Sequence, residues 1–218
     1  PVYYDFDLFN QPGQAPELDD RLMSELAYTV FDTETTGLDI RDGDEMVALG
    51  AVRIVNGRLL ESETFEQLVK PECILRADSI RIHGIQPEML EGQPDVRQAL
   101  QLFRGFAEGT ILVAHNAAFD MRLLQLQEKR TGIRFENPVL DTMLLSAVVH
   151  PFQRKHDIES IAERLGITIM GRHTALGDAI ATGEVFIKLI PLLAEMGIRT
   201  LKQAREASQK TYYARLKY

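Results

Sequence analysis

The hydrophobic pattern changes its period partway along the chain, and this change restricts the possible folds more than any other feature. Residues 28–34, 46–55 and 58–69 each have strand-like composition, and Asn56-Gly57 is a hairpin turn signal. These segments predict three consecutive antiparallel strands. Further along, short apolar runs alternate with helical spacing. The pattern predicts strands at 111–114 and 139–141, short helical pieces at 79–84 and 87–90, and helices at 95–107, 119–129, 142–149, 157–165 and 175–195.

This order of elements predicts an α/β fold with a five-stranded mixed sheet flanked by helices. Pro191 lies inside the last predicted helix, and we expect it to kink or restart that helix. With 218 residues, 45% of them hydrophobic, the chain can bury the core of one such domain. We place the domain at residues 28–195.

The two flanking segments differ in charge. Residues 1–27 form an acidic leader with six acids against Arg21, and we expect a short helix near residues 20–26. Residues 196–218 form a basic tail with six cations against Glu206, and with Tyr212, Tyr213 and Tyr218 among them. Such a tail can grip phosphates and stack bases, or it can be a helix that closes the domain or leads into another module. Because the chain begins at Pro1 without a methionine, we expect it to be processed or to be a piece of a larger protein.

Composition excludes several classes of protein. The net charge of −8 argues against non-specific binding of nucleic acid, so any nucleic acid would need local basic patches and bound metal. The single cysteine, Cys73, excludes a disulfide framework and a cysteine-rich zinc site, and is typical of a cytoplasmic protein. No apolar run is long enough to form a membrane segment.

Two carboxylates share one face of the first predicted strand. In VFDTETTG, residues 30–37, Asp32 and Glu34 are two positions apart, so both side chains point the same way. Their mutual repulsion is relieved if they bind a hard divalent cation such as Mg²⁺ or Mn²⁺, which prefers oxygen ligands. The alternative is an exposed strand end whose acids face water. The pattern alone leaves both open.

Further candidates follow later strands. In HNAAFD, residues 115–120, Asp120 can reach across the carboxyl ends of the strands, or it can simply favour the helix N-terminus electrostatically. In RHTALGD, residues 172–178, His173 can bend back from a loop toward Asp178 on the opening turns of a helix, or it can be a surface histidine. Asp141, before Thr142, is interpreted as a helix cap.

Taken together, these segments resemble a known family. DTETTG, HNAAFD and His173 with four residues before Asp178 resemble the three exonuclease motifs of the DEDD superfamily, histidine-containing (DEDDh) branch. The resemblance extends over residues 28–193. It includes IHGI, VLDT and AERLGI, which are similar to segments of the epsilon proofreading subunits of bacterial DNA polymerase III. The resemblance implies a ribonuclease-H-like exonuclease fold.

The resemblance also implies a set of metal ligands and a base. Two divalent metal ions, Mg²⁺ or Mn²⁺, act as a clamp on the attacking and leaving oxygens of a phosphodiester. Asp32 is implied to bridge both ions, Glu34 and Asp178 to complete the site for one, and Asp120 to steady the other through water. His173 is implied to take the proton of the attacking water, since an unperturbed histidine is neutral at working pH.

The same resemblance implies contacts with the substrate. Thr35, Gly37 and Leu38 are expected around the terminal nucleotide, with Gly37 allowing close approach of the backbone. His83 is expected to contact the same nucleotide, or to be a structural turn residue. Asn116 and Phe119 are expected at the next nucleotide, with the core as the alternative place for Phe119.

The function expected from the resemblance is a metal-dependent 3′→5′ exonuclease that releases nucleoside monophosphates from single-stranded ends, with DNA preferred. An RNA exonuclease of the oligoribonuclease or ribonuclease T type is the alternative enzyme, because a few contacts decide whether a 2′-hydroxyl is accepted. A non-catalytic module for a polymerase or signalling partner is the second class, and the four clustered acids argue against it. A phosphatase with an Asp-x-Asp nucleophile fits less well, since Glu34 stands where its second aspartate would be.

Overall fold

The computed structural model describes residues 15–211 and 213–215. Most of the predicted leader, residues 1–14, lies outside the described residues, as do Tyr212 and Tyr218 of the predicted tail.

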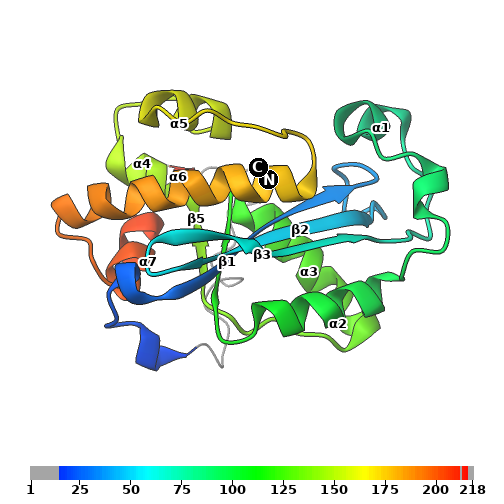
Figure 1. The fold of residues 1–218 in the computed structure, drawn as a ribbon, viewed down its shortest axis with the longest axis horizontal. Helices are drawn as coiled ribbons and strands as arrows, with labels where there is room; N and C mark the ends of the chain where they lie inside the picture. The colour runs from blue at the N-terminus through cyan, green and yellow to red at the C-terminus, as the bar shows by residue number, and fades with distance from the viewer. Residues whose placement is uncertain (1–14, 212, 216–218) are drawn as a thin grey trace.

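A five-stranded sheet forms the centre of the structure, as predicted (Figure 1). Its strand order is β3-β2-β1-β4-β5. The first three strands pair antiparallel, whereas β4 pairs parallel with β1 and β5 parallel with β4. Asn56 and Gly57 have φ of 51° and 71°, the conformation that a tight turn between β2 and β3 requires. The strands are β1 (Ala27–Thr35), β2 (Met46–Val55), β3 (Arg58–Leu68), β4 (Ile111–Ala114) and β5 (Val139–Asp141).

Seven α-helices occur in the described part of the chain. They are α1 (Ala77–His83), α2 (Val96–Ala107), α3 (Ala117–Thr131), α4 (Thr142–Val149), α5 (Ile158–Leu165), α6 (Ala175–Glu195) and α7 (Leu201–Gln209). Short 3-10 helices include η3 (Met23–Glu25), η4 (Pro87–Leu90) and η5 (Tyr213–Arg215).

Two local predictions were inaccurate. The helix expected near residues 20–26 is only the single turn η3, because Leu22 forms a β-bridge with Thr200 and Leu26 is already extended. The expected restart at Pro191 does not occur, since α6 is assigned as one helix from Ala175 to Glu195. Pro191 lies in the last turns of α6, and the buried Ile190 and Leu193 on either side of it hold the helix against the core.

Helices cover both faces of the sheet (Figure 1). On one face, α2 and α3 pack over a core that includes Phe31, Leu49 and Phe103. On the other, α6 lies across the sheet, with α5 beyond it, over a core that includes Val30 and Phe186. Residues of β1, β4 and β5 belong to these two cores, which fix the positions of the strands. The candidate site lies at the carboxyl ends of the strands.

The segments on either side of the predicted domain pack on it and on each other. In α7, Leu201 and Ala204 are buried in the second core. The guanidinium of Arg205 forms an ion pair with Asp19 at 3.1 Å, and the amide of Lys202 donates to the Asp19 carbonyl. Residues 201–209 of the predicted tail therefore form a packed helix. Among the residues that the structure describes, no helix has both the length and the apolar composition needed to cross a membrane.

Candidate active site

Asp32 and Glu34 project from the end of β1, just past the last residue that pairs with β4. That last pair is Val30 with Val113, so nothing from β4 lies beside the two acids. On the other side, β2 continues, and Gly50 is the cross-strand partner of Asp32. The carboxyl end of β1 thus presents two half-buried carboxylates toward the space above the sheet.

Gly50 lets helix α6 begin directly over this point. A Cβ at Gly50 would lie 2.2 Å from the backbone nitrogen of Leu176, in the first turn of α6. Thr174 caps the helix by accepting a hydrogen bond from the Gly177 amide at 3.0 Å. This close approach brings Asp178, also in the first turn, over the sheet. One carboxylate oxygen each from Asp32, Glu34 and Asp178 lie within 4.8 Å of one another.

The charges in this cluster are poorly compensated. The pKa of Asp32 is raised well above its usual range by burial and by repulsion from Asp120, Glu34 and Asp178. Burial, and then repulsion from Asp178 and Asp120, raises the pKa of Glu34 to about 8. A cluster of carboxylates that cannot all ionise in each other's company is stabilised by a cation. Because all the ligand atoms are carboxylate oxygens, the cluster is compatible with a divalent metal ion of the hard class.

Asp120 lies next to the other three acids but is held from a different direction. It is buried in the first turn of α3, and the Thr33 hydroxyl donates to its Oδ1 at 2.7 Å. Burial raises the pKa of Asp120 to about 7, and the Thr33 hydrogen bond opposes that shift. Asp120 is close enough to raise the pKa of Asp32, but only Asp32, Glu34 and Asp178 form the close group.

Arg172 is a charged group at this site to which the sequence analysis gave no role. Its guanidinium forms ion pairs with Asp178 and with Glu159 in the first turn of α5, where Nε donates to Glu159 Oε1 at 2.9 Å. It lowers the pKa of both Asp32 and Glu34, against the larger effects that raise them. The sequence did contain a signal for this role, because Arg172 directly precedes His173 in the motif that also holds Asp178.

His173 lies on the loop before α6, as expected from the spacing. Its backbone has φ of 68°, in the left-handed region that a non-glycine residue rarely adopts. In this conformation its amide donates to Asp178 Oδ1 at 3.1 Å, while the side chain is exposed. The backbone of His173 thus fixes a metal-ligand candidate, while its side chain is open to solvent.

The residues expected around the terminal nucleotide form the loop after β1. Thr35 and Gly37 are buried, and the Thr35 hydroxyl donates to the Gly37 carbonyl at 2.6 Å. A Cβ at Gly37 would lie 2.3 Å from the carboxylate of Asp44, so in this structure the close approach that Gly37 permits is that of Asp44. Leu38 is 84% exposed, so a ligand can reach its side chain.

His83 is engaged on both ring nitrogens. Nδ1 accepts from the Ile85 amide at 3.0 Å, which leaves the proton on Nε2, 3.2 Å from the Thr35 carbonyl. The buried ring therefore ties the end of α1 to the end of β1. This geometry matches the structural alternative for His83 and leaves only the edge of the ring for a ligand.

Asp141 caps two helices at once. Its carboxylate accepts from the Met143 amide at 2.8 Å, which is the predicted cap of α4. It also accepts from the amides of Asn116 and Ala117, at 3.0 and 2.9 Å, and so holds the start of α3. Asn116 and Phe119 are half-buried there, and Phe119 belongs to none of the core clusters of the described residues.

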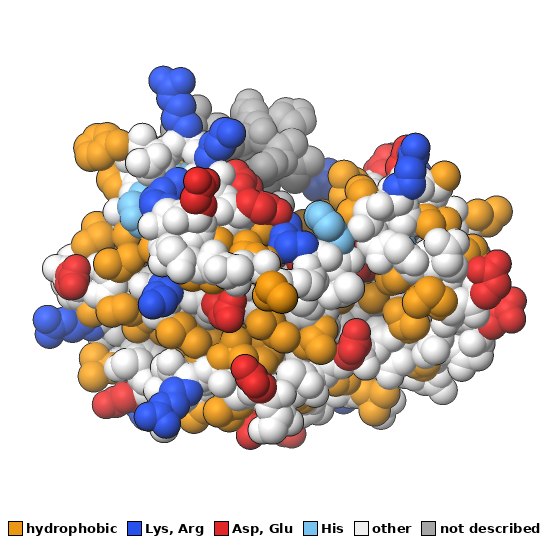
Figure 2. Space-filling view, turned by 45° about the horizontal axis from the view of Figure 1, so that its top comes forward, with side chains coloured by type: hydrophobic (Ala, Val, Ile, Leu, Met, Phe, Trp, Pro, Cys, Tyr) orange, Lys and Arg blue, Asp and Glu red, His pale blue; other side chains and the backbone are white. Residues whose placement is uncertain are grey.

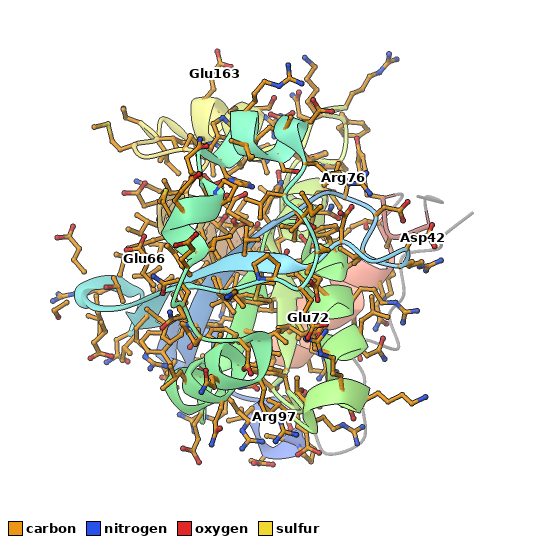
Figure 3. The ribbon with its side chains drawn as sticks, turned by 90° about the vertical axis from the view of Figure 1, so that its right-hand side faces the viewer. Asp42, Glu66, Glu72, Arg76, Arg97 and Glu163 are labelled. Atoms are coloured by element: carbon orange, nitrogen blue, oxygen red, sulfur yellow. The ribbon has the colours of Figure 1, made fainter. Side chains whose placement is uncertain are left out.

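The surface is hollowed above these strand ends. Figure 2 shows the hollow between the region of α5 and the region of α1, with acidic, basic and histidine side chains meeting at its edge. Figure 3 shows Arg76, at the start of α1, on the same side as Asp42 of the loop after β1. Arg76 pairs with Asp44 at 3.2 Å and so holds that loop in place.

Comparison with known proteins matches the exonuclease family model (RNase_T) to residues 29–186, a span that contains the whole acidic cluster. The chain belongs to the exonuclease family. One member, the DNA polymerase III subunit epsilon-like protein of Rhodobacter capsulatus, is 47% identical over 201 residues, which are 91% of this chain and 28% of that protein. The chain therefore spans little more than a quarter of that relative's length.

Solved exonucleases share the fold. Exonuclease X in complex with 5′ overhanging duplex DNA has a TM-score of 0.66 at 24% identity, and covers 83% of this chain and 99% of its own. The nuclease domain of 3'hExo, a DEDDh family member bound to rAMP, has a TM-score of 0.68 at 18% identity, and covers 82% of this chain and 95% of its own. The predicted ribonuclease-H-like exonuclease fold and the predicted family are both confirmed.

Proposed function

We propose that this chain is a metal-dependent 3′→5′ exonuclease that acts on single-stranded DNA and releases nucleoside monophosphates. The observation that carries the proposal is the close group of Asp32, Glu34 and Asp178, at the carboxyl end of β1 in an exonuclease fold. Burial and mutual repulsion raise the free energy of the ionised carboxylates unless a cation is bound. A cluster with a purely structural role would not need to carry this cost.

The proposed ligands are the four acids. Asp32, Glu34 and Asp178 would hold two Mg²⁺ or Mn²⁺ ions, and Asp120, held by Thr33, would support the second ion. When bound, the ions supply the positive charge that stabilises the attacking and leaving oxygens of the phosphodiester. The protein's part is to keep these carboxylates fixed before substrate arrives, which the approach of α6 to Gly50 supports.

His173 is the proposed general base. Its exposed imidazole accepts the proton of the attacking water as the water oxygen bonds to phosphorus and the P–O3′ bond to the preceding nucleotide breaks. The leaving 3′ oxygen takes a proton from solvent, and the imidazolium returns its proton to solvent. The loop holds it beside Asp178 through its own amide, so the base and a ligand share one short segment. The positive φ of His173 is the kind of local strain that persists where the surrounding structure requires it.

The remaining residues are proposed to hold the 3′ end of the strand. Leu38 and Phe119 offer apolar surface to bases, and Asn116 an amide at the start of α3. Thr35, Gly37 and His83 shape the wall behind the terminal nucleotide through their own hydrogen bonds. These contacts recognise a strand end by shape and stacking, and do not read its sequence.

One assay tests the proposal. The chain is incubated with end-labelled single-stranded DNA, duplex DNA and RNA, each with Mn²⁺, Mg²⁺ or chelator, and the product ladder is read. A 3′→5′ ladder from single-stranded DNA that needs metal and is lost in Asp32→Asn supports it. The matched control is Asp20→Asn, an acid far from the cluster. Full activity in chelator, or in Asp32→Asn, overturns it.

RNA is the second candidate substrate, because the similar 3'hExo domain was solved with rAMP. A faster ladder on RNA than on DNA would favour it. A polymerase setting is proposed from the name of the Rhodobacter capsulatus relative. In that setting the enzyme removes a mismatched primer terminus faster than a matched one, which the same assay measures on two primer–template duplexes.

A further inference from the structure

The loop between α4 and α5 combines an exposed aromatic ring with exposed cations. Phe152 is 96% exposed, and Arg154 and Lys155 are exposed beside it. A large apolar side chain held this far into water gains nothing from folding, so the fold alone does not account for it. Because the protein as a whole carries a charge of −8, contacts with a nucleic-acid backbone depend on local groups of cations such as this one.

Hydrogen bonds from neighbouring segments hold the backbone of this loop. The Tyr213 hydroxyl donates to the Arg154 carbonyl at 2.7 Å, and the Arg164 guanidinium donates to the Lys155 carbonyl at 2.9 Å. His156 is buried below the loop, with one ring nitrogen 3.0 Å from the Gln153 carbonyl and its ring edge against Tyr213. The carbonyls of Gln153, Arg154 and Lys155 all accept hydrogen bonds from other side chains. The backbone that carries the exposed side chains is therefore held in place.

The loop is connected to the candidate active site by a short path. Lys155 and Glu159 are four residues apart, which limits their separation to about 14 Å. Glu159 binds Arg172, which binds Asp178 and precedes His173. A strand whose 3′ end enters the acidic cluster can therefore pass the start of α5 and reach this loop. Ser160 and Glu163 of α5 also line the surface beside the loop. The cations lie in the loop, whereas Glu159 and Glu163 place acids on α5.

We propose that Phe152, Arg154 and Lys155 form a gripping loop that binds the upstream part of the single-stranded substrate, several nucleotides from the end that is cut. The Phe152 ring stacks on a base, and Arg154 and Lys155 each contact a phosphate. Stacking on aromatic rings accepts any base, and cations that follow the backbone accept any sequence, as an exonuclease requires. This inference rests on the proposed function and adds to it a second binding point on the strand.

The same geometry assigns a supporting role to Tyr213 of the predicted tail. The ring packs on His156 and the hydroxyl binds the loop carbonyls, so this residue supports the gripping loop and does not stack on bases itself.

The test measures binding and chemistry separately. Affinity for a labelled oligothymidylate of about 12 nucleotides is measured by fluorescence anisotropy in chelator, over a range of salt concentrations. Hydrolysis of the p-nitrophenyl ester of thymidine 5′-monophosphate with Mn²⁺ reports the catalytic site alone, because this substrate is too short to reach the loop. The variants are Phe152→Ala, Arg154→Gln with Lys155→Gln, and Tyr213→Phe.

The matched controls lie on the opposite side of the molecule, on α2, where Leu102, Arg97 and Arg104 are also exposed. Figure 3 shows Arg97 of α2 and Glu163 of α5 at opposite ends of the view. The control variants are therefore Leu102→Ala and Arg97→Gln with Arg104→Gln. They remove the same number of cations and a comparable apolar side chain.

Phe152→Ala should weaken binding about tenfold with no change in salt dependence. Arg154→Gln with Lys155→Gln should make the slope of log affinity against log salt shallower by about 1.4, the value for two phosphate contacts on a single strand. Ester hydrolysis should stay at the wild-type rate, and the α2 controls should bind like wild type. Tyr213→Phe should weaken binding without changing the slope.

Wild-type affinity and slope in both loop variants, together with normal ester hydrolysis, would overturn the gripping loop and leave the proposed function standing. Equal losses in the α2 controls would also overturn it, since the effect would then be one of net charge. A wild-type protein that neither hydrolyses the ester nor binds the strand would overturn the proposed function itself.

Discussion

The α-carbon of Gly50 in β2 lies against the backbone of Leu176 in α6, so closely that a Cβ at Gly50 would lie 2.2 Å from the Leu176 nitrogen. Since Gly50 is the cross-strand partner of Asp32 and Leu176 is two residues before Asp178, this one contact sets the separation of two proposed metal ligands.

We therefore expect Gly50→Ala to push the start of α6 away from the sheet. Overpacking at such a site costs about 1–3 kcal/mol of stability, and the displacement of Asp178 should lower activity by more than the loss of folded protein explains. Thermal unfolding and the rate per folded molecule check this. The control is Gly105→Ala in α2, where a Cβ meets nothing within 4 Å, and which should be neutral or stabilising. Equal behaviour of the two variants would contradict the assigned role.

The stability of the metal-free protein should fall as pH rises. Because burial and neighbouring charges raise the pKa of Glu34 from 4.5 to about 8, the folded chain binds more protons than the unfolded chain between these values. The stabilisation is fully present below about pH 4.5 and is lost as pH rises through about 8. Asp120, whose pKa is raised from 3.8 to about 7, acts in the same direction.

Unfolding midpoints in urea, with chelator present, measure this effect across the same pH range. Glu34→Gln should flatten the profile, whereas Glu91→Gln, an exposed acid elsewhere, should leave it unchanged. Added Mg²⁺ or Mn²⁺ should restore stability most strongly at high pH. Parallel profiles for wild type and Glu34→Gln would show that the raised pKa of Glu34 is not linked to folding.

Replacing His173 should separate catalysis from folding. His173→Gly removes the imidazole but keeps the amide that donates to Asp178, and glycine adopts the observed φ of 68° without strain. We expect activity to fall about 10²–10⁴-fold while stability is unchanged or higher and divalent-ion affinity is retained. Asp178→Asn, in contrast, should lose ion affinity as well as activity, and turnover near the wild-type rate in His173→Gly would place the base elsewhere.

Arg172 should compete with divalent ions for Asp178. Its guanidinium forms an ion pair with Asp178, so Arg172→Gln should destabilise the metal-free protein by about 1–3 kcal/mol and raise its affinity for Mn²⁺ several-fold. Calorimetric titration with Mn²⁺ measures the affinity. Arg130→Gln is the matched control, because Arg130 also bridges two acids, Glu45 and Glu72, away from the cluster. A lower Mn²⁺ affinity in Arg172→Gln would mean that the arginine positions Asp178 for the ion.

Much of this architecture could be predicted because it depends on local patterns. The Asn56-Gly57 turn and the two-residue spacing of Asp32 and Glu34 are set by neighbours in the chain, and both occur as predicted. Asp141 is a helix cap for the same reason. The family motifs then indicated which distant segments meet.

What could not be predicted depends on how those distant segments approach one another. Arg172 meets Glu159 only because α5 packs near the start of α6, and the residues next to Arg172 in the sequence do not indicate this ion pair. We predicted that Gly37 allows a nucleotide to approach the backbone closely. In the structure the group that lies where its Cβ would be is the carboxylate of Asp44. Gly50 carried a readable signal, since an isolated glycine inside a strand often marks a close backbone approach.

The shared cap at Asp141 has a consequence for how mutants of this enzyme are interpreted. Its carboxylate satisfies the first amides of both α3 and α4, so substituting it releases the helix that carries Asn116 and Asp120. An activity screen of all acidic positions would then report Asp141 as inactive alongside Asp32, Glu34 and Asp178, although none of its oxygens belongs to their close group. A loss of Mn²⁺-dependent turnover therefore does not identify a ligand here. Only a variant that loses ion affinity without a lower unfolding midpoint does so.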